Sequence, residues 1–219
     1  MPRDVRTHAL VLRRTNYGES DRILNLITPL GKFSVVAKSV RKEKSRLAGA
    51  VELFTLSDVV IHEGRGKLAT LTSAKMLRFY GQILTDIALL ELASSFLRRI
   101  ERAAEQTDNP EFFELLDQAL AGLNCGISPD LVSVWFDFNF LRATGEEINL
   151  FCDTSGEKLS PEKRYIWDDI EQALRLDLAG VIGVNEIKLA RLILVTKLKT
   201  VANIDEIDKI LPNIRNFVQ

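Results

Sequence analysis

The fold of the N-terminal half is decided by residues 22–40, which read RILNLITPLGKFSVVAKSV. Two runs rich in Val, Ile, Leu and Phe flank the tetrapeptide TPLG at 28–31. That tetrapeptide suits a type I turn, with proline at its second position and glycine at its fourth. The stretch therefore predicts two neighbouring strands, Arg22–Thr28 and Lys32–Val40.

Three further runs of the same kind extend this pattern, at His8–Arg14, Val51–His62 and Leu68–Lys75. Between the last two, Glu63–Lys67 contains two glycines and predicts a hairpin tip, because glycine adopts positive φ at little cost. Five short strands in about seventy residues are typical of a small closed barrel such as an OB-fold. Propensity alone does not distinguish an OB-fold from an SH3-like barrel.

From about residue 80 the apolar residues repeat at helical spacing. Four such stripes are formed by Leu89, Leu92, Ala93, Phe96, Leu97 and Ile100; by Phe112, Leu115, Leu116, Ala119, Leu120 and Leu123; by Leu131, Val134, Trp135 and Phe138; and by Ile166, Ile170, Ala173 and Leu174. A polar residue followed by proline predicts helix starts at 109–110, 128–129 and 160–161. Residues 185–201 predict one more helix. We therefore expect an α+β protein, with a five-stranded OB-fold barrel at 1–80 and an all-α helical domain at 81–219.

Charge divides the chain at the same place. Residues 1–80 contain 15 Lys and Arg against 7 Asp and Glu, whereas residues 81–219 contain 14 against 23. Such an asymmetry indicates a polyanionic partner for the basic part. We expect the first domain to bind nucleic acid and the acidic second domain to contact proteins.

The expected DNA-binding residues are the cations of the barrel and its loops: Arg13, Arg14, Arg22, Lys38, Arg41, Lys42, Lys44, Arg46, Arg65 and Lys67. Residues 41–46 carry five charges and no apolar side chain, so this segment is expected on the surface. Binding through phosphates is independent of base sequence and falls steeply with salt. Tyr17 and Phe33 are candidates for base stacking, although both are candidate core residues as well, Phe33 especially because it opens a strand.

Known catalytic patterns are missing from the sequence. It has two histidines, no phosphate-binding loop and no His-Glu-x-x-His motif. Carboxylate pairs such as Asp168-Asp169 are adjacent in sequence and so point apart on a helix. No apolar run approaches the length of a membrane span, and two cysteines fit a reducing cytosol rather than a disulfide framework. We therefore expect a cytoplasmic, nucleoid-associated protein that is not an enzyme and holds no cofactor.

Several blocks of the sequence resemble a known family, the bacterial recombination mediator RecO. The blocks are residues 9–14 (ALVLRR), 17–24 (YGESDRIL), 31–41 (GKFSVVAKSVR), 46–54 (RLAGAVELF) and 66–72 (GKLATLT). Their spacing also agrees, and from Leu141 onward the likeness is one of layout. The resemblance implies an OB-fold followed by a helical domain. It also implies a protein that binds single- and double-stranded DNA, anneals complementary strands and helps to load recombinase onto strands coated by single-strand binding protein.

The implied partners are RecR, the acidic C-terminal tail of the single-strand binding protein, RecF and the recombinase. A tail of that kind requires arginine beside an apolar groove. Candidate positions on the predicted helices are Arg142 with Phe138, and Arg98, Arg99 and Arg102. The alternative is a non-catalytic adaptor that binds proteins and contacts nucleic acid only incidentally.

The sequence departs from the family at its four-cysteine zinc ribbon. Cys152 stands at the first ligand position, but Ser155 replaces the second cysteine and the later pair is missing. A structural zinc ion requires about four such ligands. We therefore expect no metal here, and we expect Leu159, Tyr165 and Trp167 to hold this segment by packing.

Overall fold

The computed structural model describes residues 3–64, 68–146, 148–215 and 217. These residues fall into two compact units, Met1–Cys125 and Gly126–Gln219. The expected boundary at residue 80 coincides with the end of the last barrel strand. The two helices that follow nevertheless belong to the same unit as the barrel, so the first unit is longer than the barrel itself.

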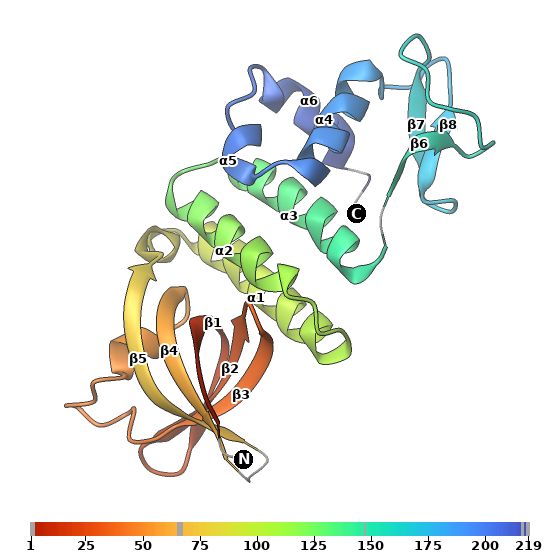
Figure 1. Ribbon diagram of the computed structural model, residues 1–219. Coiled ribbons are helices and arrows are strands. Elements are labelled where there is room, and N and C mark those ends of the chain that lie inside the picture. The colour runs from red at the N-terminus through yellow and green to blue at the C-terminus, as the bar shows by residue number, and fades with distance from the viewer. Residues whose placement is uncertain (1–2, 65–67, 147, 216, 218–219) are drawn as a thin grey trace. The chain divides into compact units, whose positions relative to one another are not determined.

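Five strands form a closed barrel in the order β1-β2-β3-β5-β4, which confirms the predicted fold class. The strands are β1 Arg3–Tyr17, β2 Asp21–Thr28, β3 Gly31–Ala37, β4 Thr55–Glu63 and β5 Ala69–Phe79. β1 pairs with β4 along its first half and with β2 along its second half, and a bulge between Val11 and Arg13 interrupts the second pairing. One long strand thereby belongs to both sides of the barrel (Figure 1).

The strands form because apolar and polar residues alternate along them. Leu24 and Leu26 of β2 lie beside Val35 and Ala37 of the neighbouring strand β3 in the core, and all four are at most 1% exposed. The predicted turn is also present: Thr28 Oγ1 donates to the Gly31 carbonyl at 2.8 Å and accepts from the Leu30 N–H at 3.0 Å. The strand–turn–strand prediction is therefore confirmed, although the second strand ends at Ala37 and not at Val40 as predicted.

Two short 3-10 helices and two long helices complete the first unit. They are η1 Ala48–Val51, η2 Gly81–Thr85, α1 Ile87–Gln106 and α2 Glu111–Asn124. The predicted stripes are their buried faces; Phe96 and Ile100 of α1, for example, are at most 1% exposed. Both helices lie across the end of the barrel where β2 turns into β3 (Figure 1).

The second unit is built on a helix that begins where the sequence predicted. α3 spans Pro129–Thr144, with Ser128 before its first proline and Gly145 closing it at φ 86°. The other helices are α4 Val184–Val195, α5 Leu198–Val201 and α6 Ile207–Arg215. The buried Asn139 Nδ2 donates to the Ile193 carbonyl at 3.2 Å, which joins α3 to α4.

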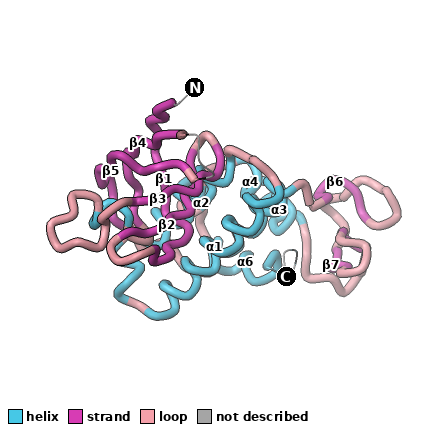
Figure 2. The backbone as a smooth tube through the Cα atoms, turned by 90° about the horizontal axis from the view of Figure 1, so that it is seen from below, coloured by secondary structure: helices cyan, strands magenta, loops and turns pink. Residues whose placement is uncertain are grey.

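The expectation of an all-α second domain is wrong for residues 149–176. These residues form a three-stranded sheet of order β6-β8-β7, with β6 Asn149–Asp153, β7 Tyr165–Asp168 and β8 Ala173–Leu176. The helix predicted from Ile166 to Leu174, and its start at 160–161, are therefore absent. Tyr, Ile and Trp at 165–167 favour a strand, and Asp168 Oδ1 accepts from the N–H groups of Ile170 and Glu171, which turns the chain into a hairpin. Figure 2 shows the strands in two groups, the barrel and the small sheet that contains β6 and β7.

Candidate nucleic-acid interface

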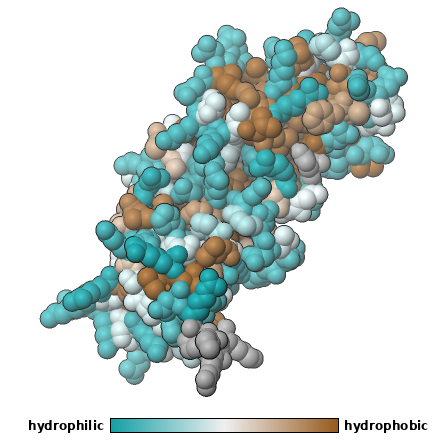
Figure 3. Space-filling view, viewed as in Figure 1, coloured by the Kyte–Doolittle hydropathy of each residue, from teal (hydrophilic) through white to brown (hydrophobic). Residues whose placement is uncertain are grey.

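Half of the predicted DNA-binding cations lie on one loop of the barrel. We call residues 38–46, which join β3 to η1, the basic loop; they read KSVRKEKSR and contain one carboxylate. The loop's cations are all exposed: Lys38, Arg41, Lys42, Lys44 and Arg46. In Figure 1 the loop is the orange segment that projects at the left, and Figure 3 shows hydrophilic side chains on that projection. The expected surface position of residues 41–46 is confirmed.

The basic loop is anchored to the turn between β1 and β2. The Arg41 N–H donates to the Ser20 carbonyl at 2.9 Å, and the Ser39 N–H donates to Asp21 Oδ1 at 2.7 Å. The Arg41 side chain reaches the Gly18 carbonyl at 3.4 Å, and Val40 is buried in the core. The loop and the turn therefore form one surface, at the end of the barrel remote from α1 and α2 (Figure 1).

Two of the predicted arginines are engaged within the protein. Arg14 of β1 and Arg22 of β2 both form ion pairs with Glu52, which follows η1; the Arg22 pair measures 3.0 Å. Their side chains are 27% and 23% exposed. Burial lowers the pKa of the Arg14 guanidinium, and the neighbouring Arg22 charge lowers it further. This cluster keeps a net charge of about +1 beside the basic loop, but its arginines are held in place by Glu52.

The remaining candidates for DNA contact on the barrel differ in their exposure. Arg13 is exposed on β1, whereas Arg65 and Lys67 lie outside the described residues. Tyr17 is 55% exposed at the end of β1 and is available for stacking, while Phe33 packs against the core.

The outer face of β2 and β3, through which OB-folds commonly bind oligonucleotides, is contacted here by acidic residues of α1. Asn25 Nδ2 donates to Glu101 Oε1 at 2.6 Å, and Lys32 Nζ lies 3.0 Å from Glu105 Oε1. Lys32 also reaches the Glu101 carbonyl at 3.4 Å. Two carboxylates over these strands disfavour phosphates there. The sequence feature that could have indicated this acidic cover is the pair of glutamates at i and i+4, Glu101 and Glu105, near the C-terminal end of α1.

The predicted protein-binding positions of the second unit lie partly in its core. Phe138 is 1% exposed, so it cannot contribute to a surface groove. Arg142 is exposed, and its Nη1 donates to the Leu194 carbonyl at 2.8 Å. Leu194 is one wall of an apolar groove of about 340 Å³ that sequence reasoning missed. Its lining residues are Ile148, Leu150, Phe151, Lys188, Arg191, Leu192, Leu194 and Val195.

That groove combines positively charged side chains with exposed apolar ones. The Arg191 guanidinium donates to the Leu150 carbonyl at 2.7 Å and lies 5.1 Å from the centre of the Phe151 ring. Phe151 is 69% exposed and Val195 78%. On α1, Arg98 and Arg102 are exposed and Arg99 is half-buried, but the neighbouring Phe96 is 1% exposed. Of these two regions, only the second unit's groove combines arginine with exposed apolar side chains among the described residues.

The small sheet stands where the resemblance implied a zinc ribbon, and its residues do not suit zinc. Ser155 Oγ donates to Asp153 Oδ1 at 2.6 Å, and this bond lowers the pKa of Asp153. Over the described ranges, no group of three or more His, Cys, Asp or Glu side chains is placed to bind a metal. The segment is instead packed: Tyr165 is fully buried, and Trp167 stacks on Phe217 with ring centres 5.2 Å apart.

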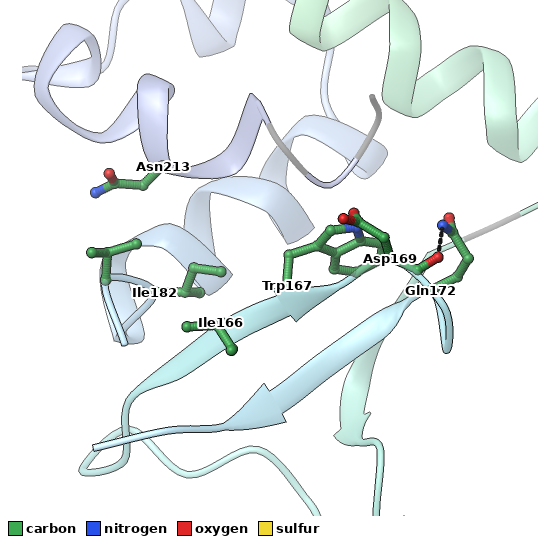
Figure 4. A pocket seen from close by; sticks show the side chains of 7 residues that line it. Ile166, Trp167, Asp169, Gln172, Ile182 and Asn213 are labelled. Atoms are coloured by element: carbon green, nitrogen blue, oxygen red, sulfur yellow. Dashed lines mark hydrogen bonds between the residues drawn. The ribbon is translucent and has the colours of Figure 1, made fainter. Parts of the chain in front are cut away.

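A cavity of about 450 Å³ opens beside this sheet, and Figure 4 shows the side chains around it. Ile166 and Trp167 come from β7, whereas Asn213 comes from α6 and donates to Glu186 Oε1 at 3.1 Å. The Gln172 side chain donates to the Asp169 carbonyl at 2.8 Å, across the tip of the β7–β8 hairpin. The cavity therefore combines apolar walls with polar groups that are used locally.

The carboxylates considered for catalysis are also used by the fold. Besides two turn N–H groups, Asp168 accepts from Arg175 Nε at 3.1 Å; the backbone bond from Glu171 is the largest cause of its lowered pKa. His62 Nδ1 lies 2.6 Å from Asp4 Oδ1 on the surface of the barrel.

None of the helices in the described part of the chain is both long and apolar enough to cross a membrane.

Fold and site together define a class: an OB-fold barrel with a projecting cationic loop, joined to a second, mainly helical unit. The sequence model of the family described as "Recombination protein O N terminal" matches residues 1–80, the barrel itself.

Curated proteins named "DNA repair protein RecO" are similar along most of the chain. The protein from Dehalococcoides mccartyi strain CBDB1 is 35% identical over 173 residues, which are 75% of this chain and 66% of that protein. The Roseiflexus sp. strain RS-1 protein is 33% identical over 178 residues, or 80% and 62%. The protein from D. mccartyi strain 195 is 32% identical over 200 residues, or 88% and 79%. The chain belongs to the RecO family, and it spans less than two thirds of the length of the first two of these relatives.

Proposed function

We propose that the basic loop and the adjoining β1–β2 turn bind the phosphate backbone of DNA, and that the protein acts as a non-catalytic mediator of DNA repair and recombination at the nucleoid. The observation that carries the proposal is the anchored, exposed loop with five cations and one carboxylate. Cations at such a surface displace the counterions of the backbone, which drives binding to single and double strands alike.

This surface also supplies a physical basis for strand annealing. Two complementary strands repel each other through their phosphates, and exposed lysines and arginines screen that repulsion. Because the loop is anchored at Ser20 and Asp21 but exposed along its length, its side chains can follow a flexible backbone. Annealing through this surface requires no ATP, and it should weaken steeply with salt. In the proposed role, strands held in this way are passed to a recombinase.

The experiment measures annealing of complementary oligonucleotides without ATP at rising salt. We expect the double variant Lys42→Glu/Lys44→Glu to lose about tenfold or more in rate at low salt, since both side chains are exposed. The control Lys199→Glu/Lys209→Glu makes the same charge change at exposed positions of the second unit. Absence of annealing by the unaltered protein, or equal loss in both variants, would contradict the proposal.

For the second unit we propose partner binding, with the acidic C-terminal tail of single-strand binding protein in the groove beside Arg142. Exposed Phe151 and Val195 suit an apolar end, and Lys188 and Arg191 suit carboxylates. Titration of a tail peptide should show weaker binding to Phe151→Ala and to Lys188→Glu. Unchanged affinity in both variants would exclude this groove as the binding site of the tail. RecR, with RecF and the recombinase, completes the proposed set of partners.

The same groove favours a second candidate function, that of a protein adaptor whose DNA binding is incidental. The two functions are separated by capture of partners from lysate with and without nuclease. Partner retention that survives nuclease and is lost in Phe151→Ala, together with unimpaired repair by Lys42→Glu/Lys44→Glu in cells, favours the adaptor.

A further inference from the structure

The first unit has an apolar groove next to the basic loop that the phosphate contacts do not use. It is open, has a volume of about 370 Å³ and lies between η1, β5, η2 and the start of α1. Phe54, 3% exposed, is buried beneath it. Three of its side chains are large, apolar and unusually exposed: Met76 at 43%, Phe79 at 45% and Leu84 at 51%. Apolar surface left open in this way marks a binding groove.

The groove adjoins the elements that flank the basic loop: Gly49 of η1, the helix that follows the loop, is one of its lining residues. Glu52 and Arg14 also line the groove. Glu52 forms a second ion pair with Arg22 of β2, and Arg22 is paired in the sheet with Ala37 of β3, the residue directly before the loop. Glu52 is the one carboxylate among the described lining residues, and two arginines neutralise it. The edge of the groove at Arg14 and Glu52, together with the adjoining Arg22, therefore carries a net positive charge.

Backbone geometry explains why this part of β5 is open. β5 closes the barrel against β3 through two pairs, Val35 with Ala69 and Val36 with Thr70. Further along, the described pairing of β5 is with β4 alone, as far as Thr55 opposite Phe79. The outer face of β2 and β3, by contrast, is contacted by Glu101 and Glu105. Carboxylates thus cover the outer face of β2 and β3, whereas the end of β5 borders an apolar groove whose one described lining carboxylate is paired with arginines.

We propose that this groove accepts unpaired bases of a single strand whose phosphates lie on the basic loop. The aromatic ring of Phe79 and the thioether of Met76 offer stacking and dispersion contacts that every base can use, so binding remains independent of sequence. Bases of a duplex stay stacked inside it and cannot enter. The groove therefore gives the protein a preference for single strands, which the basic loop alone does not supply. This inference rests on the proposed DNA-binding function.

The test compares Phe79→Ala and Met76→Ala with Leu77→Ala, a control on the same strand. Leu77 is 47% exposed but lines a different cavity, with Arg6 and His8. Affinities for a single strand and for the matching duplex are measured at one salt concentration. We expect Phe79→Ala to weaken single-strand binding about tenfold, Met76→Ala to weaken it less, and neither to change duplex binding. Leu77→Ala should change neither.

A second measurement tests the groove in the unaltered protein, so its main comparison does not depend on how well a variant folds. An oligonucleotide with abasic sites keeps its phosphates but offers no bases, so the unaltered protein should bind it about tenfold more weakly than the base-bearing strand. Phe79→Ala should show a smaller difference between the two strands, because only the contacts of Met76 and its neighbours remain. Equal binding of both strands by the unaltered protein, or equal loss on single strand and duplex in Phe79→Ala, would overturn the groove assignment and leave the proposed function intact. Failure of the unaltered protein to bind either nucleic acid would overturn both.

Discussion

Two surfaces of the barrel use their cations in opposite ways. In the basic loop the lysines and arginines are exposed, and none forms an ion pair with the residues that the structure describes. On the face of β2 and β3, Lys32 is 15% exposed and reaches Glu101 and Glu105 of α1. The contrast teaches that a count of positive residues is a poor guide to a DNA surface. What matters is whether the fold supplies a carboxylate for each cation.

The largest expected effect follows from removing the loop's charge altogether. Replacing Lys38, Arg41, Lys42, Lys44 and Arg46 by glutamine removes up to five phosphate contacts. The slope of log affinity against log salt should then flatten by up to about 3.5 for a single strand. Affinity in low salt should fall at least a hundredfold, on the order of 2.7 kcal/mol. Salt titration followed by fluorescence anisotropy measures both the slope and the affinity. An unchanged slope would mean that DNA binds at another surface of the protein.

A smaller effect, in the opposite direction, is expected on the acidic face. Glu101→Gln/Glu105→Gln removes both carboxylates and leaves the Lys32 ammonium without an ion-pair partner there. We expect single-strand affinity to rise about two- to fivefold at low salt and the gain to vanish at high salt. As a control, Glu206→Gln removes one exposed carboxylate of the second unit that is also paired with a lysine, Lys209, and it should have no effect. A fall in affinity would mean that these carboxylates support DNA binding rather than oppose it.

The cluster of Arg14, Arg22 and Glu52 is intermediate between the exposed cations of the basic loop and the paired Lys32. A substitution in this cluster should change the stability of the protein. Glu52→Gln leaves two partly buried guanidinium groups together without a counter-charge. We expect the free energy of unfolding to fall by about 1 kcal/mol, measured by urea denaturation. High salt should recover part of the loss, because it screens the repulsion. A loss that salt does not change would mean that packing, rather than charge, is responsible.

The smallest effect concerns a cation that is exposed but already paired. Arg6 binds Asp58 Oδ2 at 2.6 Å, and this bond is the largest cause of the lowered pKa of Asp58. Arg6→Gln should leave DNA affinity within about twofold and should raise the pKa of Asp58 toward its ordinary value, as followed by NMR titration. A lowered pKa in the folded state stabilises the protein above the unfolded pKa. That contribution disappears as pH falls through the folded value, so the variant should lose this part of its acid dependence.

Most of the barrel could be read from sequence because its signals are local, although the strand predicted from Val51 begins only at Thr55. The TPLG turn, the alternating strands and the charged segment at 41–46 each specify their own structure, and all three are confirmed. Helical periodicity was equally reliable for α1, α2 and α3. It failed at 166–174, where four apolar residues matched a helical stripe by chance while the turn chemistry of Asp168 and the β propensity of Tyr165–Trp167 decided the outcome.

The sites depended on contacts that sequence spacing does not reveal. Glu52 captures Arg14 and Arg22 from two different strands, and Glu101 and Glu105 reach the barrel from a helix more than sixty residues further along. Both apolar grooves arise where separate elements meet, so their lining residues have no common period. Burial of Phe138 was within reach of sequence reasoning, since it belongs to the predicted apolar stripe of α3.

The position of α1 and α2 has a practical consequence for anyone who exchanges parts between RecO relatives. The family pattern ends at residue 80, but the compact unit ends at Cys125. Ile27 and Phe112 are completely buried in that unit, and Gly31 is packed so closely against Asp108 that a methyl group would collide with it. A chimaera joined at residue 80 would pack the barrel of one relative against the helices of another, so the two sides of this interface would not match. A junction after residue 125 would transfer the barrel and its two helices together, with the interface between them intact.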